Sequence, residues 1–245
     1  MRMTRFIVTS LASTLLIAGT AGAQERELVI PDVGTPTLPA KAPTVQGFVP
    51  AGWTIESRLD GPIDADAKAD AVLLLHNADP RNVLHNDGFG VQELDTNPRL
   101  LVVLVADPAG GWRRVAQSDR LIRRNDNPTR EDPLEEGSVS LDKRVLAVTV
   151  GFFANMGSWS TSRTTYKFRW QDGCMRMVGF DEDSVQRNSG ETTDVSVNLL
   201  TNKASRTVGS IEDDRTHVRR YTLKSRAPVC LETVNDEFDP GVPGE

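Results

Sequence analysis

One local pattern recurs through most of this 245-residue chain: an alternating or apolar run, a tight turn, and a second alternating run. Three examples are residues 100–116, 164–180 and 195–208, whose turns are centred on Gly110, Gly173 and Asn202. Turn residues between runs rich in β-branched side chains predict β-hairpins. Residues 145–153 form a near-continuous apolar run, which is typical of a strand inside a sheet.

Helical spacing is almost absent after the first 23 residues. We therefore predict an all-β, antiparallel hairpin meander that forms either a sandwich or a small propeller-like domain over residues 53–234. With 38% hydrophobic and 25% charged residues, the chain is neither wholly disordered nor a multi-span membrane protein. The net charge of -6 argues against a nucleic-acid partner, which would need a basic face.

The N-terminus has the three parts of a secretory signal peptide. Arg2 and Arg5 precede an apolar run over residues 6–18, and the small residues Ala21-Gly22-Ala23 follow. The run is shorter than the ~20 residues of a membrane anchor, so we predict a signal peptide over residues 1–23 and no membrane anchor. The mature chain is then expected in the periplasm or outside the cell.

Two segments flank the predicted domain. Residues 24–52 contain five prolines and are expected to form an extended linker or an arm packed on the domain: Pro31, Pro36, Pro39, Pro43 and Pro50. Residues 235–245 are acidic and rich in Pro and Gly, which predicts a disordered tail.

The two cysteines, Cys174 and Cys230, both lie in the predicted exported part. In an oxidising compartment a single pair is expected to form one disulfide, and two buried free thiols are the alternative. Neither cysteine has the surroundings of a catalytic nucleophile.

Residues 59–75 contain acids at alternate positions and lead into an apolar strand. Asp64, Asp66 and Asp70 are spaced to direct carboxylates at one calcium ion. The stretch resembles the Asp-x-Asn-x-Asp-Gly loop of FG-GAP proteins, but Pro62 replaces the first acidic ligand and Ala67 replaces the turn glycine. The alternatives are a calcium site and a solvated acidic turn.

A loop of small polar residues around one tryptophan follows the apolar strand at residues 145–153. Ser158, Trp159, Ser160 and Arg163 form a candidate recognition loop, in which the ring supplies contact area and the guanidinium suits a carboxylate. The alternative is that Trp159 folds back onto the sheet as part of the core.

The same block, with the acid-rich loop and residues 196–203, resembles a family of exported bacterial β proteins. The family includes immunity proteins against peptidoglycan hydrolases delivered by type IV secretion, and is similar to periplasmic inhibitors of i-type lysozymes. The resemblance spans residues 53–208 and implies that a Ser-Gly-x-Tyr loop enters the hydrolase cleft. Here the matching residues are Ser189, Gly190 and Thr192, with Thr192 in place of Tyr, so the loop at residues 157–163 is a rival.

No catalytic signature stands out. The three histidines, His76, His85 and His217, are scattered, and nucleophile-elbow, zinc and phosphate-loop motifs are absent. We therefore expect a protein that is not an enzyme and has no catalytic residues. The leading hypothesis is a periplasmic lysozyme inhibitor or immunity protein that blocks a peptidoglycan hydrolase by loop insertion. The alternatives are a non-inhibitory cell-envelope scaffold, with or without calcium, and a sugar-active hydrolase.

Overall fold

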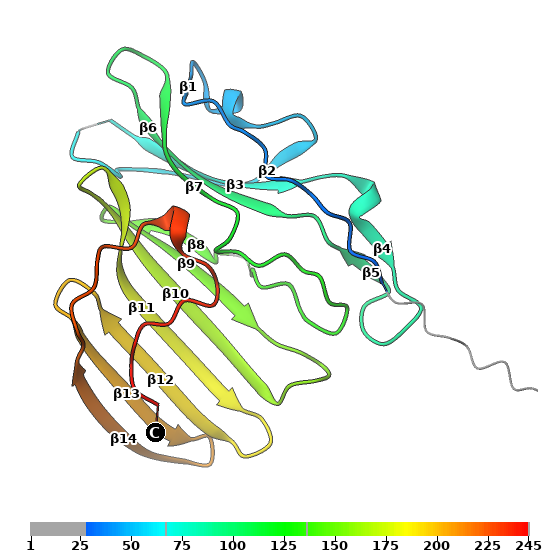
Figure 1. The fold of residues 1–245 in the computed structure, drawn as a ribbon, viewed down its shortest axis with the longest axis vertical. Helices are drawn as coiled ribbons and strands as arrows, with labels where there is room; N and C mark the ends of the chain where they lie inside the picture. The colour runs from blue at the N-terminus through cyan, green and yellow to red at the C-terminus, as the bar shows by residue number, and fades with distance from the viewer. Residues whose placement is uncertain (1–27, 67, 136, 245) are drawn as a thin grey trace, which may run out of the picture.

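The structure, a computed structural model, describes residues 28–244 apart from 67 and 136. The predicted signal peptide at residues 1–23 lies outside the described residues. The described residues form fourteen strands and three short 3-10 helices, and every pair of neighbouring strands is antiparallel. The all-β antiparallel prediction is confirmed, and the architecture is a sandwich (Figure 1). None of the helices described has the length and apolar character needed to span a bilayer.

The first sheet has five strands in the order β1-β7-β6-β3-β2. Its strands are β1 (Lys41–Ala42), β2 (Trp53–Gly61), β3 (Asp70–Asn77), β6 (Arg99–Ala106) and β7 (Trp112–Ser118). The central strands β3 and β6 are buried along almost their whole length. Continuous burial means that both faces of this sheet are covered, which explains why these two strands are runs of Leu, Val and Ala instead of alternating sequences.

The second sheet is an up-and-down meander of seven strands in the order β14-β13-β12-β11-β10-β9-β8. Its strands are β8 (Val139–Asp142), β9 (Val145–Phe152), β10 (Ser160–Gln171), β11 (Cys174–Gln186), β12 (Glu191–Asn198), β13 (Lys203–Ser210) and β14 (Asp213–Thr222). At the β10–β11 turn, Asp172 and Gly173 have φ of 53° and 79°, as the predicted turn chemistry requires. Outside the two sheets, β4 (Val83–His85) and β5 (Glu93–Asp95) form a small hairpin after the helix η2 (Pro80–Asn82).

The main core lies between the two sheets. Apolar side chains of β3, β6 and β7 meet those of β9, β10 and β11, with Tyr166 and Phe180 packed edge to face at 5.6 Å. The seven-stranded sheet extends well beyond this contact, and β14 lies at its far side from the five-stranded sheet (Figure 1).

The Pro-rich segment is an arm packed on the domain. Leu38, Val45 and Phe48, the last two in the 3-10 helix η1 (Val45–Phe48), are buried against the outer face of the five-stranded sheet. Together with Leu73, Leu75 and other side chains of β3 and β6, they form a second apolar cluster. The arm therefore covers the outer face of β3 and β6 and excludes water from it.

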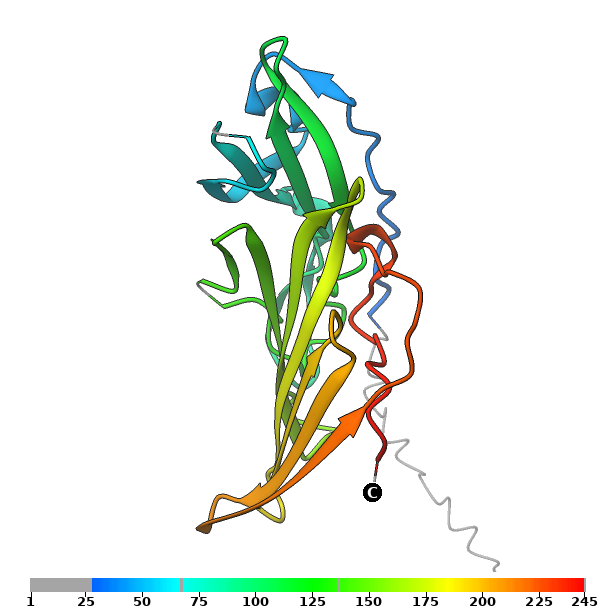
Figure 2. The same cartoon turned by 90° about the vertical axis from the view of Figure 1, so that its left-hand side faces the viewer.

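The C-terminal segment crosses the core face of the seven-stranded sheet (Figures 1 and 2). Its 3-10 helix η3 (Leu231–Thr233) buries Leu231 completely, and Val234 is 1% exposed. Farther along, Phe238 and Val242 pack against the main core, with the Phe238 ring 6.0 Å from that of Phe180. The prediction of a disordered tail from residue 235 therefore differs from the structure, because apolar side chains among the acids attach this segment to the sheet.

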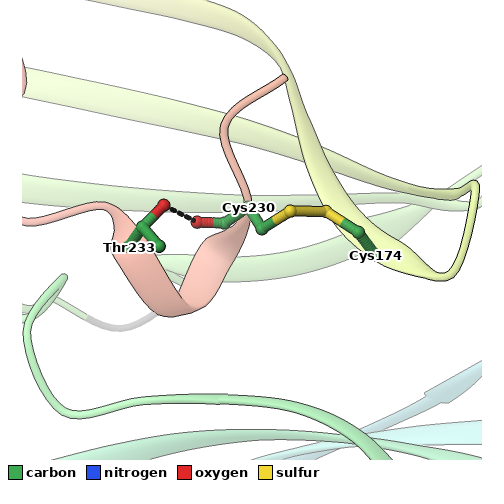
Figure 3. Close-up of a disulfide and its surroundings, with 3 residues drawn as sticks. All are labelled: Cys174, Cys230 and Thr233. Atoms are coloured by element: carbon green, nitrogen blue, oxygen red, sulfur yellow. Dashed lines mark hydrogen bonds between the residues drawn. A yellow bond between two sulfur atoms is a disulfide. The ribbon is translucent and has the colours of Figure 1, made fainter. Parts of the chain in front are cut away.

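A disulfide joins Cys174, at the start of β11, to Cys230, just before η3 (Figure 3). The Val229 carbonyl accepts a hydrogen bond from the Met177 N–H at 2.8 Å, and the Thr233 hydroxyl donates to the Cys230 carbonyl. The predicted pairing is confirmed, and free thiols are excluded. A disulfide of this kind indicates an oxidising compartment outside the cytoplasm.

Candidate functional site

Three connections lie together at one end of the seven-stranded sheet. They are the β9–β10 loop, the β11–β12 turn and the β13–β14 turn, seen at the lower right of the sheet in Figure 1. The Arg187 N–H donates to the Trp159 carbonyl at 2.8 Å, and the Ile211 N–H donates to the Gly190 carbonyl at 2.9 Å. Backbone hydrogen bonds therefore join all three connections, and the two rival recognition loops are direct neighbours.

Arg187 holds the β9–β10 loop in place. Its Nη2 donates to the carbonyls of Ala154, at 2.5 Å, and Ser158, at 2.7 Å. Its guanidinium also lies 4.4 Å from the centre of the Phe153 ring, a cation–π distance. Arg187 was not predicted as a site residue, because nothing in the local sequence shows that the β11–β12 turn faces a loop almost thirty residues earlier.

Three large apolar side chains are exposed at this end of the sheet. Trp159 is 65% exposed, Met156 is 50% exposed and Ile211 is 68% exposed. We call these three residues the tip patch. Trp159 does not fold back onto the sheet, so the core alternative considered for it does not hold. Large exposed apolar side chains held on a fixed backbone are typical of a surface that another macromolecule covers.

The small residues of the predicted loops shape the two turns. The Ser158 hydroxyl accepts a hydrogen bond from the Ser160 N–H at 3.0 Å, and the Ser189 hydroxyl accepts from Glu191 at 3.3 Å. Gly190 has φ of 74°, and a Cβ at this position would lie 2.9 Å from Ile211. Glycine is therefore needed both for the left-handed backbone and for the contact with the tip patch.

Ser160, Arg163 and Thr192 lie in strands instead of loops. β10 begins at Ser160, three residues before Arg163, and Thr192 is the second residue of β12. Hydrogen bonding to β9 and β11 extends β10 beyond the start at residue 164 that the apolar pattern indicated. Arg163 therefore does not share a loop with Trp159.

Arg163 and Thr192 line a shallow groove of about 360 Å³ on the outer face of the sheet. Arg163 pairs with Glu135 at 2.9 Å, so its guanidinium already has a carboxylate partner within the chain. On the other side of Arg163, Asp183 lies opposite Asp194 in the β11–β12 pair. Burial and the neighbouring Asp183 raise the pKa of Asp194. This groove adjoins the tip and, unlike the tip patch, contains several charged side chains.

A second cavity, of about 260 Å³, lies where the segment 123–133 faces β9, β10 and β11. It is lined by Arg123, Arg130, Phe152 and Glu182, among others. Burial raises the pKa of Glu182, although the positive charge of Arg206 opposes this effect. The cavity mixes both charges, and of the residues in the two predicted recognition loops only Ser162 lines it.

The acidic loop between β2 and β3 brings the three predicted metal ligands together. Carboxylate oxygens of Asp64, Asp66 and Asp70 all lie within 4.8 Å of one another, and no other such group of acids, histidines or cysteines occurs in the part of the chain that the structure describes. Two oxygens that share a calcium ion at about 2.4 Å lie at most about 4.8 Å apart, so the spacing fits a bound cation. The cluster could therefore hold a metal ion.

Asp70 also has a structural role in this loop. It is 1% exposed and accepts three backbone hydrogen bonds, from Ile63 at 2.8 Å, Asp64 at 3.1 Å and Ala106 at 3.0 Å. These bonds join the loop to the end of β6. Asp64 and Asp66 each accept one backbone N–H within the loop, which leaves further lone pairs on both carboxylates. The loop is preformed by its own hydrogen bonds.

Comparison with protein-family models, with curated proteins and with solved structures found no match for this chain.

Proposed function

We propose that this chain is a periplasmic immunity protein or inhibitor that blocks the active-site cleft of a lysozyme-like peptidoglycan hydrolase. The observation that carries the proposal is the tip patch: Trp159 stands 65% exposed on a loop that Arg187 holds by two hydrogen bonds. A rigid aromatic side chain loses little conformational freedom on binding, which suits it to fill a groove in another protein. The signal-like N-terminus and the disulfide support export.

A hydrolase of this class offers a long cleft with two carboxylates, one of which is protonated as the general acid. In the proposed complex, Trp159 and Met156 enter the cleft, and the hydroxyls of Ser158 and Ser189 donate hydrogen bonds to the carboxylates. Such blockage needs no chemistry from the inhibitor, so the chain acts as a binding protein and not as an enzyme. Arg163, which is paired with Glu135 and lies in β10, contributes from the edge of the contact.

The charge of the chain favours the encounter. Its net charge of -6, made more negative by removal of Arg2 and Arg5 with the signal peptide, attracts an enzyme that is cationic because it binds the anionic cell wall. Long-range attraction of this kind raises the association rate more than the affinity, and salt weakens it.

We further propose that the metal ion of the acidic loop is calcium. Calcium prefers six to eight oxygen ligands, and the carboxylates of Asp64, Asp66 and Asp70 supply three or more of them. Among the described residues, no Lys or Arg forms an ion pair with these three acids. A bound cation would relieve their mutual repulsion and stabilise the connection between β2 and β3.

The experiment measures lysis of a peptidoglycan suspension by the hydrolase encoded beside the gene for this chain. The purified chain is expected to abolish lysis at a near-stoichiometric ratio, and Trp159→Ala is expected to weaken inhibition at least tenfold because hot-spot aromatics contribute about 2 kcal/mol or more. Phe89→Ala is the matched control, because Phe89 is 67% exposed but lies between β4 and β5.

Equal loss of inhibition in both variants would contradict the role of the tip. A complex that forms on gel filtration without loss of lysis would instead assign the chain to the non-inhibitory envelope-binding class, and absence of any complex would refute the proposed partner.

A further inference from the structure

Strand β14 leaves a long free edge on the seven-stranded sheet. It runs for ten residues, and among the described residues it pairs only with β13. Nine of its ten residues are exposed. The Leu223 N–H donates to the Asn202 carbonyl, so residues 217, 219 and 221 turn their backbone groups toward β13. Val218 and Arg220 therefore turn their N–H and C=O groups toward the free edge, and Thr216 continues this alternation next to the register shift between Val208 and Ser210.

The other sheet edges in the described structure are short, or are bulged and lie beside another strand. β1 has two residues and β8 has four, and β2 carries a bulge between Ile55 and Ser57 and lies beside β8. Soluble proteins protect long edges with charged side chains, above all Lys, and with Pro, bulges or short strands. Between His217 and Thr222 the β14 edge has no Lys and no Pro, and this part pairs regularly with residues 208–203 of β13. The register shifts only nearer the turn, between Val208 and Ser210.

The charges along β14 run from acidic to basic. Glu212, Asp213 and Asp214 stand at its start, and Arg219 and Arg220 stand near its end. Two identical strands with this order are complementary when they run antiparallel, because the acidic start of each then faces the basic end of the other. This is the arrangement that a two-fold axis perpendicular to a sheet produces.

One position of the two-fold axis would also place an acidic residue of the second copy beside two arginines that lie opposite each other within the chain. Arg206 on β13 lies directly opposite Arg219 on β14, and cross-strand pairs of like charge are destabilising. The Arg206 Nε atom is buried and has no hydrogen-bond partner among the described residues. With the axis at Thr216, Asp213 of the second copy lies opposite Arg219, next to this pair, and Glu212 of the second copy lies opposite Arg220.

We propose that two copies of this chain pair through β14, antiparallel and with the two-fold axis at Thr216, so that their seven-stranded sheets become one continuous sheet. Asp213, which within one chain pairs with Arg215 at 2.6 Å, is then shared with Arg219 of the other copy. Because the β13–β14 turn belongs to the tip, the two tip patches lie at opposite ends of the dimer. This inference does not depend on the hydrolase as partner.

Sedimentation equilibrium of the purified chain tests the proposal. The mass of the wild type is expected to reach twice that of one chain as the concentration is raised to about 100 µM. Arg219→Asp places like charges opposite each other and is expected to return the mass to that of one chain. The double variant Asp213→Arg with Arg219→Asp exchanges the two charges and is expected to restore the dimer.

A cysteine at the axis tests the register. Residues directly opposite in a hydrogen-bonded antiparallel pair have Cα atoms about 5.5 Å apart, which a disulfide spans. Since both native cysteines are already bonded, Thr216→Cys adds a single free thiol and is expected to give a covalent dimer on mild oxidation. Val218→Cys is the matched control, because its two copies would lie about 13 Å apart along the strands.

A wild-type mass that stays at one chain over this range would overturn the proposal, as would a dimer mass that Arg219→Asp leaves unchanged. Efficient cross-linking through Val218→Cys and not through Thr216→Cys would overturn the register.

Discussion

Replacing both cysteines with serine is expected to cost this protein a large part of its stability. The variant Cys174→Ser with Cys230→Ser opens a covalent loop whose ends are 56 residues apart in the sequence. In the chain-entropy description, closing a loop of this length removes enough freedom from the unfolded chain to stabilise the fold by about 4 kcal/mol. Typical domains have only about 5–15 kcal/mol in total.

The contacts that residues 229–234 make in the folded protein lead to a second expectation. Leu231 and Val234 are buried in the main core, and the Val229 carbonyl accepts a backbone hydrogen bond from β11. These contacts do not depend on the sulfur–sulfur bond. The serine variant should therefore keep its native fold and lose stability mainly because its unfolded state gains freedom.

Urea unfolding followed by tryptophan fluorescence measures the difference in free energy of unfolding between the two forms. The wild type treated with reductant under native conditions is the control, and it should match the serine variant. A loss below about 1 kcal/mol would refute the entropic reasoning. A loss of native fluorescence in the folded variant would show that the disulfide, and not the packing of Leu231, positions the segment.

Three further outcomes are expected. Millimolar calcium should raise the melting temperature by mass action, and Asp66→Asn should reduce the rise; melts that coincide in chelator and in calcium would rule out calcium binding. Burial raises the folded-state pKa of Glu182 above its ordinary 4.5, so the wild type should lose stability relative to Glu182→Gln as pH rises from 4 to 7. A wild type that gains stability relative to this variant over the same pH range would contradict the prediction. Phe48→Ala removes a side chain with 0% exposure and should cost about 3–5 kcal/mol in urea unfolding, whereas a cost below about 1 kcal/mol would mean that the arm adds little.

Several hairpins could be predicted because their turns have distinctive chemistry. The hairpins at residues 100–116 and 164–180 correspond to β6–β7 and β10–β11, with Gly110 and Gly173 both at positive φ. In contrast, β14 was not predicted. Its side chains are exposed on both faces, so the apolar alternation that reveals a half-buried strand does not occur there.

The packing of the N-terminal arm and of the C-terminal tail on the sheets could not be predicted from local sequence patterns. The prolines of the arm allowed either a linker or a packed arm, and only the burial of Phe48 against β3 and β6 distinguishes them. The tail was expected to be disordered because acids, Pro and Gly dominate its composition. A single aromatic residue of the tail, Phe238, packs on Phe180 and attaches it to the sheet.

The candidate site could be predicted in part. Trp159 was identified from the small polar residues around it, and the turn at Ser189 and Gly190 from the resemblance to a Ser-Gly-x-Tyr loop. Their adjacency depends on strand pairing between β10 and β11. Arg163 was assigned to the wrong element, because a polar strand end resembles a loop in sequence. Arg187, in the β11–β12 turn, forms hydrogen bonds with the β9–β10 loop, and no local sequence pattern indicates this contact.

The order of strands has a consequence for how the two halves of the sandwich assemble. Every strand of the seven-stranded sheet pairs with the strand just before or after it in the chain, whereas Lys41 in β1 pairs with Arg113 in β7. Contacts between near neighbours in sequence form quickly, and contacts across long stretches of chain form slowly. We therefore expect the C-terminal meander to fold first and to act as a template, with the N-terminal arm docking in the last step.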